Sequence, residues 1–439
     1  MTEKMRTKES RKSSLTEDER GISRRAYLAA AGGVVAAAVI GGAAYYLLAP
    51  SPTPAKKEAI KIGLCASMTG PYWTWGVHLA RGAELAVDEI NAKGGILDRL
   101  IQFTALDDAE GGAPNVTLGR EKMERLYAEG NLVCIATEHS GVWPHQLQVA
   151  KKYGRPLLNC ISLNYDPRTK DFYDVGKYSF NFSMDAKQEG VAYGKWAYEN
   201  MGRKIYIFGA DYAMGHTMAT AMWYHFCEEQ GGTLAGASFA PLGTTDYTPW
   251  LEKIRAANPD FVFVCNAGSD SIKFNQQFTE FGLAKEFPRC GMNVTVVESD
   301  IPQAAEAFEG YVVMTSYSST LDIPWNVQFR ESYEKRYGET TSNPQCYSYE
   351  ALHVLKEAIE DVGSLDPNDI IKSLEGRWFD SVEGKRHIRD VDHAVFSDYR
   401  IYEVRGGRHA KLLGTIKGED IEAADKPSLG VSPYPKPPW

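Results

Sequence analysis

The sequence predicts an α/β fold in which parallel sheets are covered by helices. Short runs of β-branched and apolar residues alternate with amphipathic stretches at helical spacing, which is typical of strand–helix–strand units and hence of parallel sheets. The alternation occurs in two successive series. The chain has 439 residues, more than the roughly 250–300 at which a single core stops growing. We therefore expect two α/β domains of similar size.

The first series runs from residue 59 to residue 162. Residues 59–65, AIKIGLC, predict a strand, and residues 78–95 place Leu79, Leu85 and Ile90 near helical spacing before a Gly-Gly stop. The same pattern then repeats. It predicts strands at 100–108, 132–138 and 155–162 and helices at 114–130 and around 143–152.

A second series follows from residue 204. The run KIYIFGAD (204–211) predicts a strand, and residues 215–232 predict the helix after it. Beyond residue 320 the pattern is less regular, and hairpin-like β-structure is expected within 387–417. Further strands are expected at 234–241, 260–266, near 289–297 and at 310–318, and helices at 248–259, 269–283, 324–338 and 348–363.

The N-terminal segment differs from the rest in composition. Residues 1–25 are polar and charged and end in Arg24-Arg25, which resembles a twin-arginine export signal. Residues 26–49 carry no charge, and this length is enough to span a bilayer, for which about 20 residues suffice. The charged flank favours an N-terminus inside the cell and the remainder outside. We expect residues 26–49 to be a cleaved signal or a retained membrane anchor, and residues 50–58 to be a Pro-rich linker.

The seven cysteines show no CxxC motif, and four of them lie in apolar strand-like runs. This placement predicts buried free thiols. An exported protein could still oxidise one pair, and the odd number leaves at least one thiol unpaired.

Several function classes find no support in the sequence. The net charge of -9 and the lack of a basic stripe argue against nucleic-acid binding. There is no GxSxG, no HExxH, and no GxGxxG after the first strand; GVAYGK (190–195) has too few residues between its glycines for a P-loop and predicts a helix. Pairs such as Glu138-His139 lack a third metal ligand at suitable spacing. We expect a protein that is not an enzyme and holds no metal or cofactor.

The loops after the strands are the best candidates for a binding site, because ligands of open α/β sheets lie beyond the carboxyl ends of the strands. These loops are rich in Ser, Asn, Tyr and Trp, which suits a small polar or zwitterionic ligand with an apolar part. Residues such as Asn266 and Asp270 are equally typical of ordinary turns. The loops concerned are 69–76, 138–144, 162–167, 210–215 and 266–270.

The opening stretch IKIGLCASMTGPYWTWG, the segment GAELAVDEINAKGGI, the following LIQFTALDDAE, the DYAMG turn and GKRHIRDVDH (384–393) together resemble one known family. It comprises the extracytoplasmic solute-binding proteins of branched-chain amino acid type ABC importers, the leucine/isoleucine/valine-binding-like type I periplasmic binding proteins. The resemblance covers roughly residues 59–415. It implies two doubly wound, Rossmann-like lobes in a Venus-flytrap arrangement, with crossovers near 180–185, 315–320 and 380–384. The implied parts are lobe I (59–182 plus 319–382), lobe II (183–318 plus 383–425) and a Pro-rich tail (426–439), disordered or laid on the surface.

The resemblance also implies ligand contacts. The ring of the opening loop falls on Trp75, with Tyr72 and Trp73 beside it, and the ring of the second lobe falls on Tyr212. The family's acidic residue for a ligand ammonium falls on Asn293, and Glu298 would replace it only if the register slipped; an ordinary α-amino acid is therefore less favoured than an amide, a urea-like compound or an aromatic or other carboxylate. Polar contacts are implied at Ser140, Gly141, Ser162, Asn164, Tyr165, Asn266 and Gly268.

The function implied by the resemblance is capture of a small organic solute by hinge closure. The closed receptor would deliver the solute to ABC permease subunits, which work with cytoplasmic ATPases. A ligand sensor of the same fold that takes no part in transport is the alternative.

Overall fold

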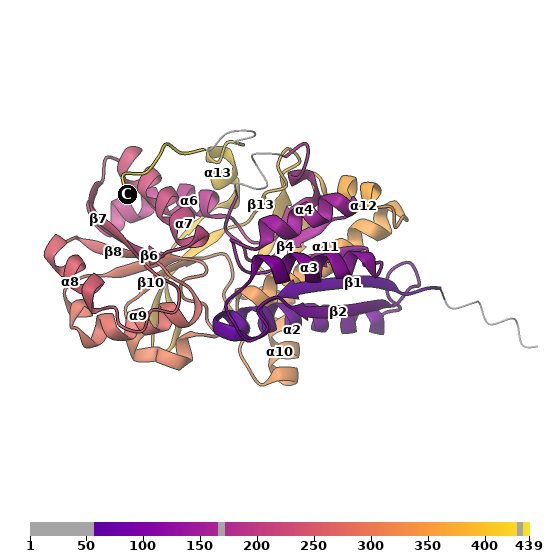
Figure 1. Ribbon diagram of the computed structural model, residues 1–439, viewed down its shortest axis with the longest axis horizontal. Helices are drawn as coiled ribbons and strands as arrows, with labels where there is room; N and C mark the ends of the chain where they lie inside the picture. Colours follow the sequence, from indigo (N-terminus) through magenta and orange to yellow (C-terminus); the bar gives the residue numbers. More distant parts are fainter. Residues whose placement is uncertain (1–56, 166–171, 428–432) are drawn as a thin grey trace, which may run out of the picture. The chain divides into compact units, whose positions relative to one another are not determined.

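The computed structural model describes residues 57–165, 172–427 and 433–439 (Figure 1). The predictions for residues 1–25 and 26–49, and for the linker up to Lys56, lie outside the described residues. Within the described ranges, no helix is both long and apolar enough to cross a membrane.

The first sheet is parallel throughout, in the order β2-β1-β3-β4-β5. One face packs against α2 and α11 through Ile62 and Leu64, and the other packs against α3 and α4 through Cys65. Figure 1 shows α3 and α4 on the side of this sheet opposite to α2. The sheet is therefore doubly wound, as predicted. Its elements are β1 (Ile60–Ala66), η1 (Gly70–Tyr72), α2 (Trp73–Ala92), β2 (Ile101–Asp107), α3 (Val116–Ala128), β3 (Val133–Ile135), α4 (Trp143–Tyr153), β4 (Leu157–Asn159), η2 (Gly176–Tyr178) and β5 (Ser179–Asn181).

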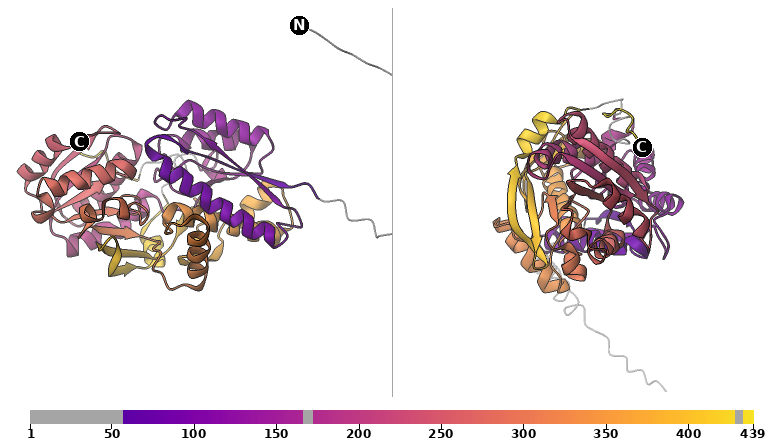
Figure 2. Two further views of the ribbon diagram at one scale, coloured as in Figure 1. Left: turned by 90° about the horizontal axis from the view of Figure 1, so that it is seen from below. Right: turned by 90° about the vertical axis from the view of Figure 1, so that its left-hand side faces the viewer.

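The second sheet has the order β15-β14-β10-β9-β8-β6-β7. Strands β6 to β10 are mutually parallel, whereas β14 and β15 are antiparallel and form one edge, drawn in yellow in Figure 2. The predicted helix 215–232 ends early as an α-helix and continues as a π-helical turn, η3. The elements are α6 (Ala186–Asn200), β6 (Lys204–Ala210), α7 (Ala213–Trp223), η3 (Tyr224–Glu228), β7 (Thr233–Ala240), α8 (Thr248–Ala257), β8 (Phe261–Cys265), α9 (Gly268–Glu280), η4 (Leu283–Lys285), β9 (Arg289–Met292), η5 (Ile301–Phe308), β10 (Val312–Thr315), β14 (Tyr399–Arg405) and β15 (Arg408–Ile416).

A third, small sheet extends the first one. Its strands follow the order β11-β12-β13, and Ala394, next to β13, forms a parallel bridge with Asn181 of β5. The predicted lobe boundary at residue 383 falls inside the β11–β12 hairpin, whose strands pair with each other. The remaining elements are α10 (Pro324–Tyr337), α11 (Asn343–Val362), α12 (Pro367–Leu374), β11 (Trp378–Ser381), β12 (Gly384–Ile388), β13 (Val395–Phe396) and α13 (Gly418–Ala424).

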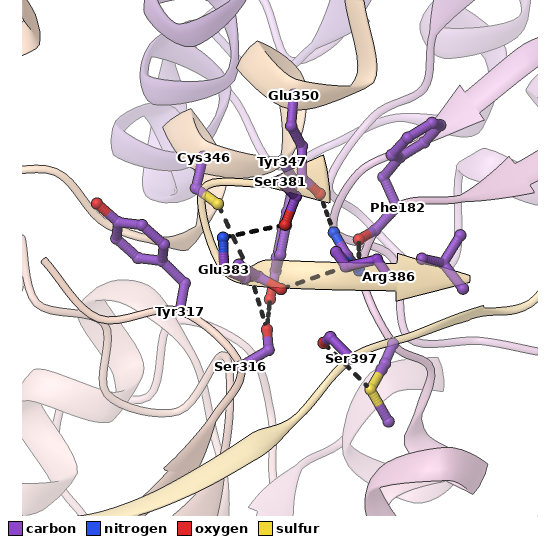
Figure 3. Close-up of polar contacts among 12 residues, drawn as sticks. Phe182, Ser316, Tyr317, Cys346, Tyr347, Glu350, Ser381, Glu383, Arg386 and Ser397 are labelled. Carbon is purple, nitrogen blue, oxygen red and sulfur yellow. Dashed lines mark hydrogen bonds and ion pairs between the residues drawn. The ribbon is translucent and has the colours of Figure 1, made fainter. Parts of the chain in front are cut away.

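The connections between the sheet systems meet at a buried polar cluster (Figure 3). The chain passes from β5 to α6 after Phe182, from β10 to α10 after Ser316, and from β13 to β14 at Ser397. The first two connections lie where the family resemblance implies them, but the third lies at 397–398 rather than near 380–384, because β12 and β13 still belong to the third sheet. Arg386 donates from Nη2 to the Phe182 carbonyl (2.6 Å), and Ser316 Oγ donates to Glu383 Oε1 (3.0 Å).

All seven cysteines are buried and none is in a disulfide, which agrees with the prediction of buried free thiols. Burial raises the pKa of the Cys227 thiol to about 12. The GVAYGK segment is helical, also as predicted, and lies in α6. Its two glycines, Gly190 and Gly194, let this helix approach His225 of η3 closely, since a Cβ at either position would lie within 2.8 Å of that histidine.

The described end of the C-terminal tail, residues 433–439, lies on η3 and α7. Tyr434 is buried, and its hydroxyl is 3.0 Å from Nε2 of His225. The Trp439 ring meets the edge of Trp223 at 6.0 Å between centroids. This part of the tail is laid on the surface, which was one of the two expectations, and Tyr434 anchors it.

Candidate functional site

A small pocket, with a cavity volume of about 10 Å³, lies where strands of both sheets end. Residues after β1, β3 and β4 line it from the first sheet, and residues after β6, β8 and β9 line it from the second. This is the place that the strand-end rule for open α/β sheets predicts. This volume is about that needed for one water molecule, so the lining side chains must move apart to admit a solute. The lining residues are Tyr72, Trp75, Glu138, His139, Ser140, Ile161, Tyr212, Met214, Ala267 and Val294.

The aromatic stretch after β1 is the start of a helix, and not the loop expected from its sequence. Helix α2 begins at Trp73, and Gly76 makes this possible because a Cβ there would lie 2.1 Å from the Ser67 carbonyl oxygen. The helical turn separates the three rings. Tyr72 and Trp75 line the pocket, whereas Trp73 is 51% exposed and is not among the lining residues.

Three rings from both sheet systems meet over the pocket. His139 stacks on Tyr212 with 4.9 Å between centroids, and Tyr72 lies 5.7 Å from His139 and 6.4 Å from Tyr212. The Gly141 N–H donates to Nδ1 of His139 (3.2 Å). Burial lowers the pKa of His139 to about 4, so this ring is neutral at pH 7. Tyr212, which the family resemblance implied as the ring of the second lobe, is the ring that the second sheet contributes to the pocket.

Four helices begin at the pocket without a side-chain cap: α2, α4, α7 and α9. Of the described helices that start elsewhere, α8, α10 and α13 also have no side-chain cap, whereas Asn, Asp or Ser side chains stand at the starts of α3, α6, α11 and α12. The first N–H groups of an uncapped helix need partners, and the helix dipole makes that end attractive to anions. A carboxylate in the pocket could supply such partners.

Ser140 is held by the predicted residues of the next loop. Its Oγ accepts from Ser162 Oγ (3.2 Å) and from the Leu163 N–H (3.2 Å), and its carbonyl accepts from Asn164 Nδ2 (3.5 Å). Ser162 and Asn164 thus act behind Ser140, which alone of the three lines the pocket. Tyr165 is buried and packs edge-on against Tyr434 of the tail.

After β8 and β9, the pocket is lined by the chain neighbours of the predicted residues and not by the predicted residues themselves. Ala267 lines the pocket, between buried Asn266 and Gly268, the first residue of α9, at φ +55°. Asn293 points away to the buried cluster, where its Nδ2 donates to Tyr347 Oη (2.8 Å), and Val294 takes its place in the lining.

Buried acids near the pocket escaped the sequence prediction. Glu138 lines the pocket, and its Oε2 accepts from the Ser67 N–H (3.2 Å). Burial and the nearby Asp108 raise the pKa of Glu138 to about 8. Asp300 lies beside Trp75, and burial raises its pKa to about 7. Glu298, the alternative considered for the Asn293 position, instead accepts from Ser319 in a crossover connection.

The sequence carried a usable signal for two of the missed residues. Glu138 and His139 follow β3 directly, in a loop already singled out, but the Glu-His pair was considered only as a metal ligand. The other missed residues are apolar and give no such signal: Ile161, Met214, Ala267 and Val294. Within the described residues no group of three or more His, Cys, Asp or Glu side chains is placed to hold a metal ion. Rings, apolar groups and unpaired polar atoms together make this an arrangement for binding.

Comparison with known families gives one extensive match. A family model described as "Periplasmic binding protein" matches residues 59–408. Among curated proteins, the Leu/Ile/Val-binding protein homolog 4 of Brucella melitensis is 23% identical over 376 residues, which cover 83% of this chain and 88% of the relative.

Solved structures show the same fold. The solute binding protein of an ABC transporter from R. palustris, in complex with benzoate, matches with a TM-score of 0.75 at 22% identity, over 82% of this chain and 97% of that chain. The branched-chain amino acid transporter substrate binding protein from Streptococcus pneumoniae, in complex with isoleucine, has a TM-score of 0.71 at 21% identity, over 82% and 99%. These likenesses establish the architecture.

Proposed function

Because the chain belongs to the periplasmic binding protein family, we propose that it is an extracytoplasmic receptor that captures a small organic solute and delivers it to an ABC-type permease. The observation that carries the proposal is the position of the pocket. It lies between the carboxyl ends of strands from both sheets, and rings from both sides close over it. A solute held there would contact both sheet systems at once.

The capture mechanism proposed is hinge closure of two lobes. Three connections join the sheet systems at one buried cluster, so bending there would move the second sheet and its Tyr212 relative to His139. Closure removes water from the pocket, and neutral hydrogen bonds then discriminate strongly between solutes.

The proposed ligand is an amino acid, an amide or urea-like compound, or an aromatic or other carboxylate. The uncapped helix starts would bind a carboxylate or carbonyl oxygen. The rings of Tyr72, Trp75 and Tyr212 would cover a flat or apolar part.

A thermal-shift screen of these compound classes tests the receptor function, because ligand binding raises the melting temperature by mass action. For the best compound, Trp75→Ala should abolish the shift, since Trp75 lines the pocket. Trp73→Ala is the matched control, because Trp73 is exposed and lies two residues before Trp75 in the same helix. Equal binding by both variants would place the ligand elsewhere.

Delivery to a permease and membrane attachment are separate parts of the proposal. Residues 26–49, which lie outside the described residues, would export the protein after the Arg24-Arg25 pair and anchor it if they are retained. Uptake of the identified solute by cells should then require this chain. Normal uptake by cells lacking it, together with a changed response to the solute, would favour the alternative role as a sensor.

A further inference from the structure

Three buried carboxyl groups surround the rings of the pocket. Glu138 lines it, Asp270 lies close enough to the Tyr72 and Tyr212 hydroxyls to raise their pKa values, and Asp300 lies beside Trp75. Of the residues described as lining the pocket, none is Lys or Arg. Of the three carboxyl groups only Glu138 lines the pocket, and Asp270 and Asp300 lie behind its rings.

Glu138 is the acid most directly presented to a ligand. It is only 6% exposed, and its Oε1 has no hydrogen-bond partner, while its Oε2 is held by the Ser67 N–H. A buried polar atom without a partner is costly and calls for one. The titratable groups that face Glu138 are all acidic or neutral: Asp108, Cys65, Tyr72, Tyr212 and the adjacent His139.

Asp270 repeats this arrangement from the second sheet. It lies in the first turn of α9, where the helix dipole favours a negative charge, and its Oδ2 accepts from the Gly243 N–H (3.0 Å). Its Oδ1 has no hydrogen-bond partner, and the charge of Lys273, one turn further along α9, partly offsets the rise that burial causes in the pKa of Asp270. Neither Asp270 nor Lys273 is among the residues that line the pocket. Asp270 therefore adds a second buried carboxyl group near the Tyr72 and Tyr212 rings of the pocket.

The rings complete a site for a cation. Tyr72, Tyr212 and the neutral His139 form a cluster with centroids 4.9–6.4 Å apart, and aromatic faces attract ammonium-type groups through their quadrupole. Aromatic faces combined with buried carboxylates are a recurring solution for binding organic cations.

We propose that the solute carries an organic cationic group, such as an ammonium or amidinium, and that Glu138, supported by Asp270, determines the preference for it. This inference rests on the proposed receptor function and narrows its ligand class, since a neutral amide or a simple carboxylate would leave Glu138 unmatched. A zwitterion would satisfy both the acids and the uncapped helix starts.

The proposal has a consequence for pH. A cation binds the ionised form of Glu138, and burial raises the pKa of that carboxyl to about 8. Binding therefore releases a proton at pH 6–7, and affinity should rise with pH by up to about tenfold per unit and level off above the pKa. A ligand that needed the protonated acid would show the opposite slope.

The test uses matched compounds in calorimetric titrations of the full-length protein at pH 6 and pH 8. Benzamidine is a cation and benzamide is neutral, although their shapes are similar. Leucine carries an ammonium group that 4-methylpentanoate lacks. The Kd of the compound with the cationic group should be at least about tenfold lower than the Kd of the other compound of its pair. Glu138→Gln should remove this preference and the pH slope, and Asp270→Asn should weaken it. Glu121→Gln, at an exposed position, should change neither.

Tighter binding of benzamide or 4-methylpentanoate, or an unchanged preference in folded Glu138→Gln and Asp270→Asn variants, would overturn the cation inference and leave the receptor function standing. If no compound of the wider screen binds at all, the receptor function itself fails. Melting curves of each variant establish that it is folded.

Discussion

Replacing Arg386 by Met should destabilise the protein strongly at neutral pH. Arg386 is fully buried; it is paired with Glu350 and lies 3.5 Å from Glu383, and it also donates to the Phe182 carbonyl. Met preserves most of the volume but leaves two buried carboxyl groups without their cation. Breaking a buried ion pair from one side costs about 3–5 kcal/mol, so we expect a loss of this size in the free energy of unfolding at pH 7.5.

Urea denaturation at two pH values separates charge from packing. Burial already raises the pKa of Glu383 to about 7, and loss of the nearby guanidinium should raise it further. At pH 5.5 Glu383 binds a proton, so the cost should shrink by about 1 kcal/mol or more. The double variant Arg386→Met/Glu350→Gln should recover part of the loss. Arg377→Met is the control, because Arg377 pairs with the exposed Asp361 and should cost less than about 1 kcal/mol. An equal cost at both pH values would show that the charge account is wrong.

Three further predictions concern the pocket and the tail. Gly215→Ala should lower the free energy of unfolding, measured by urea denaturation, by about 1–3 kcal/mol and weaken solute binding, because its Cβ would lie 2.0 Å from the Ala210 carbonyl oxygen and displace the start of α7. Unchanged stability would contradict this close packing. Glu138, whose pKa is raised to about 8, keeps its proton longer when folded than when unfolded, so its contribution to the free energy of unfolding of the ligand-free protein should fall as pH rises from 5 to 8. In melting curves across this range, Glu138→Gln should therefore lose less stability with rising pH than the parent protein, and an identical pH dependence would exclude this contribution. Tyr434→Phe should cost about 1 kcal/mol by removing the hydroxyl contact with His225, and an unchanged melting temperature would mean that the tail is held by its ring alone.

The sequence predicted the site better at the level of loops than at the level of side chains. The loops after β1, β3 and β6 all reach the pocket, as expected. Within them, Trp75, Ser140 and Tyr212 line it, but Trp73 points outward because it starts a helix, in which neighbouring residues face different directions. Glu138 lies in one of these loops but was considered only as a metal ligand, and the missing hydrogen-bond partner of its Oε1 is visible only in the folded structure.

The sequence by itself determined the α/β architecture, since the alternation of strands and helices follows from side-chain periodicity, which is a local property. It also determined which loops follow the strands, and so which segments could hold a ligand. Only the tertiary structure decided which side chains meet. Val294 lines the pocket while its neighbour Asn293 joins the crossover cluster, because both lie in the turn after β9, which sends successive side chains in different directions. The convergence of Glu138, Asp270 and Asp300 around the rings likewise depends on sheet order and on contacts between residues far apart in the chain, which local pattern does not encode.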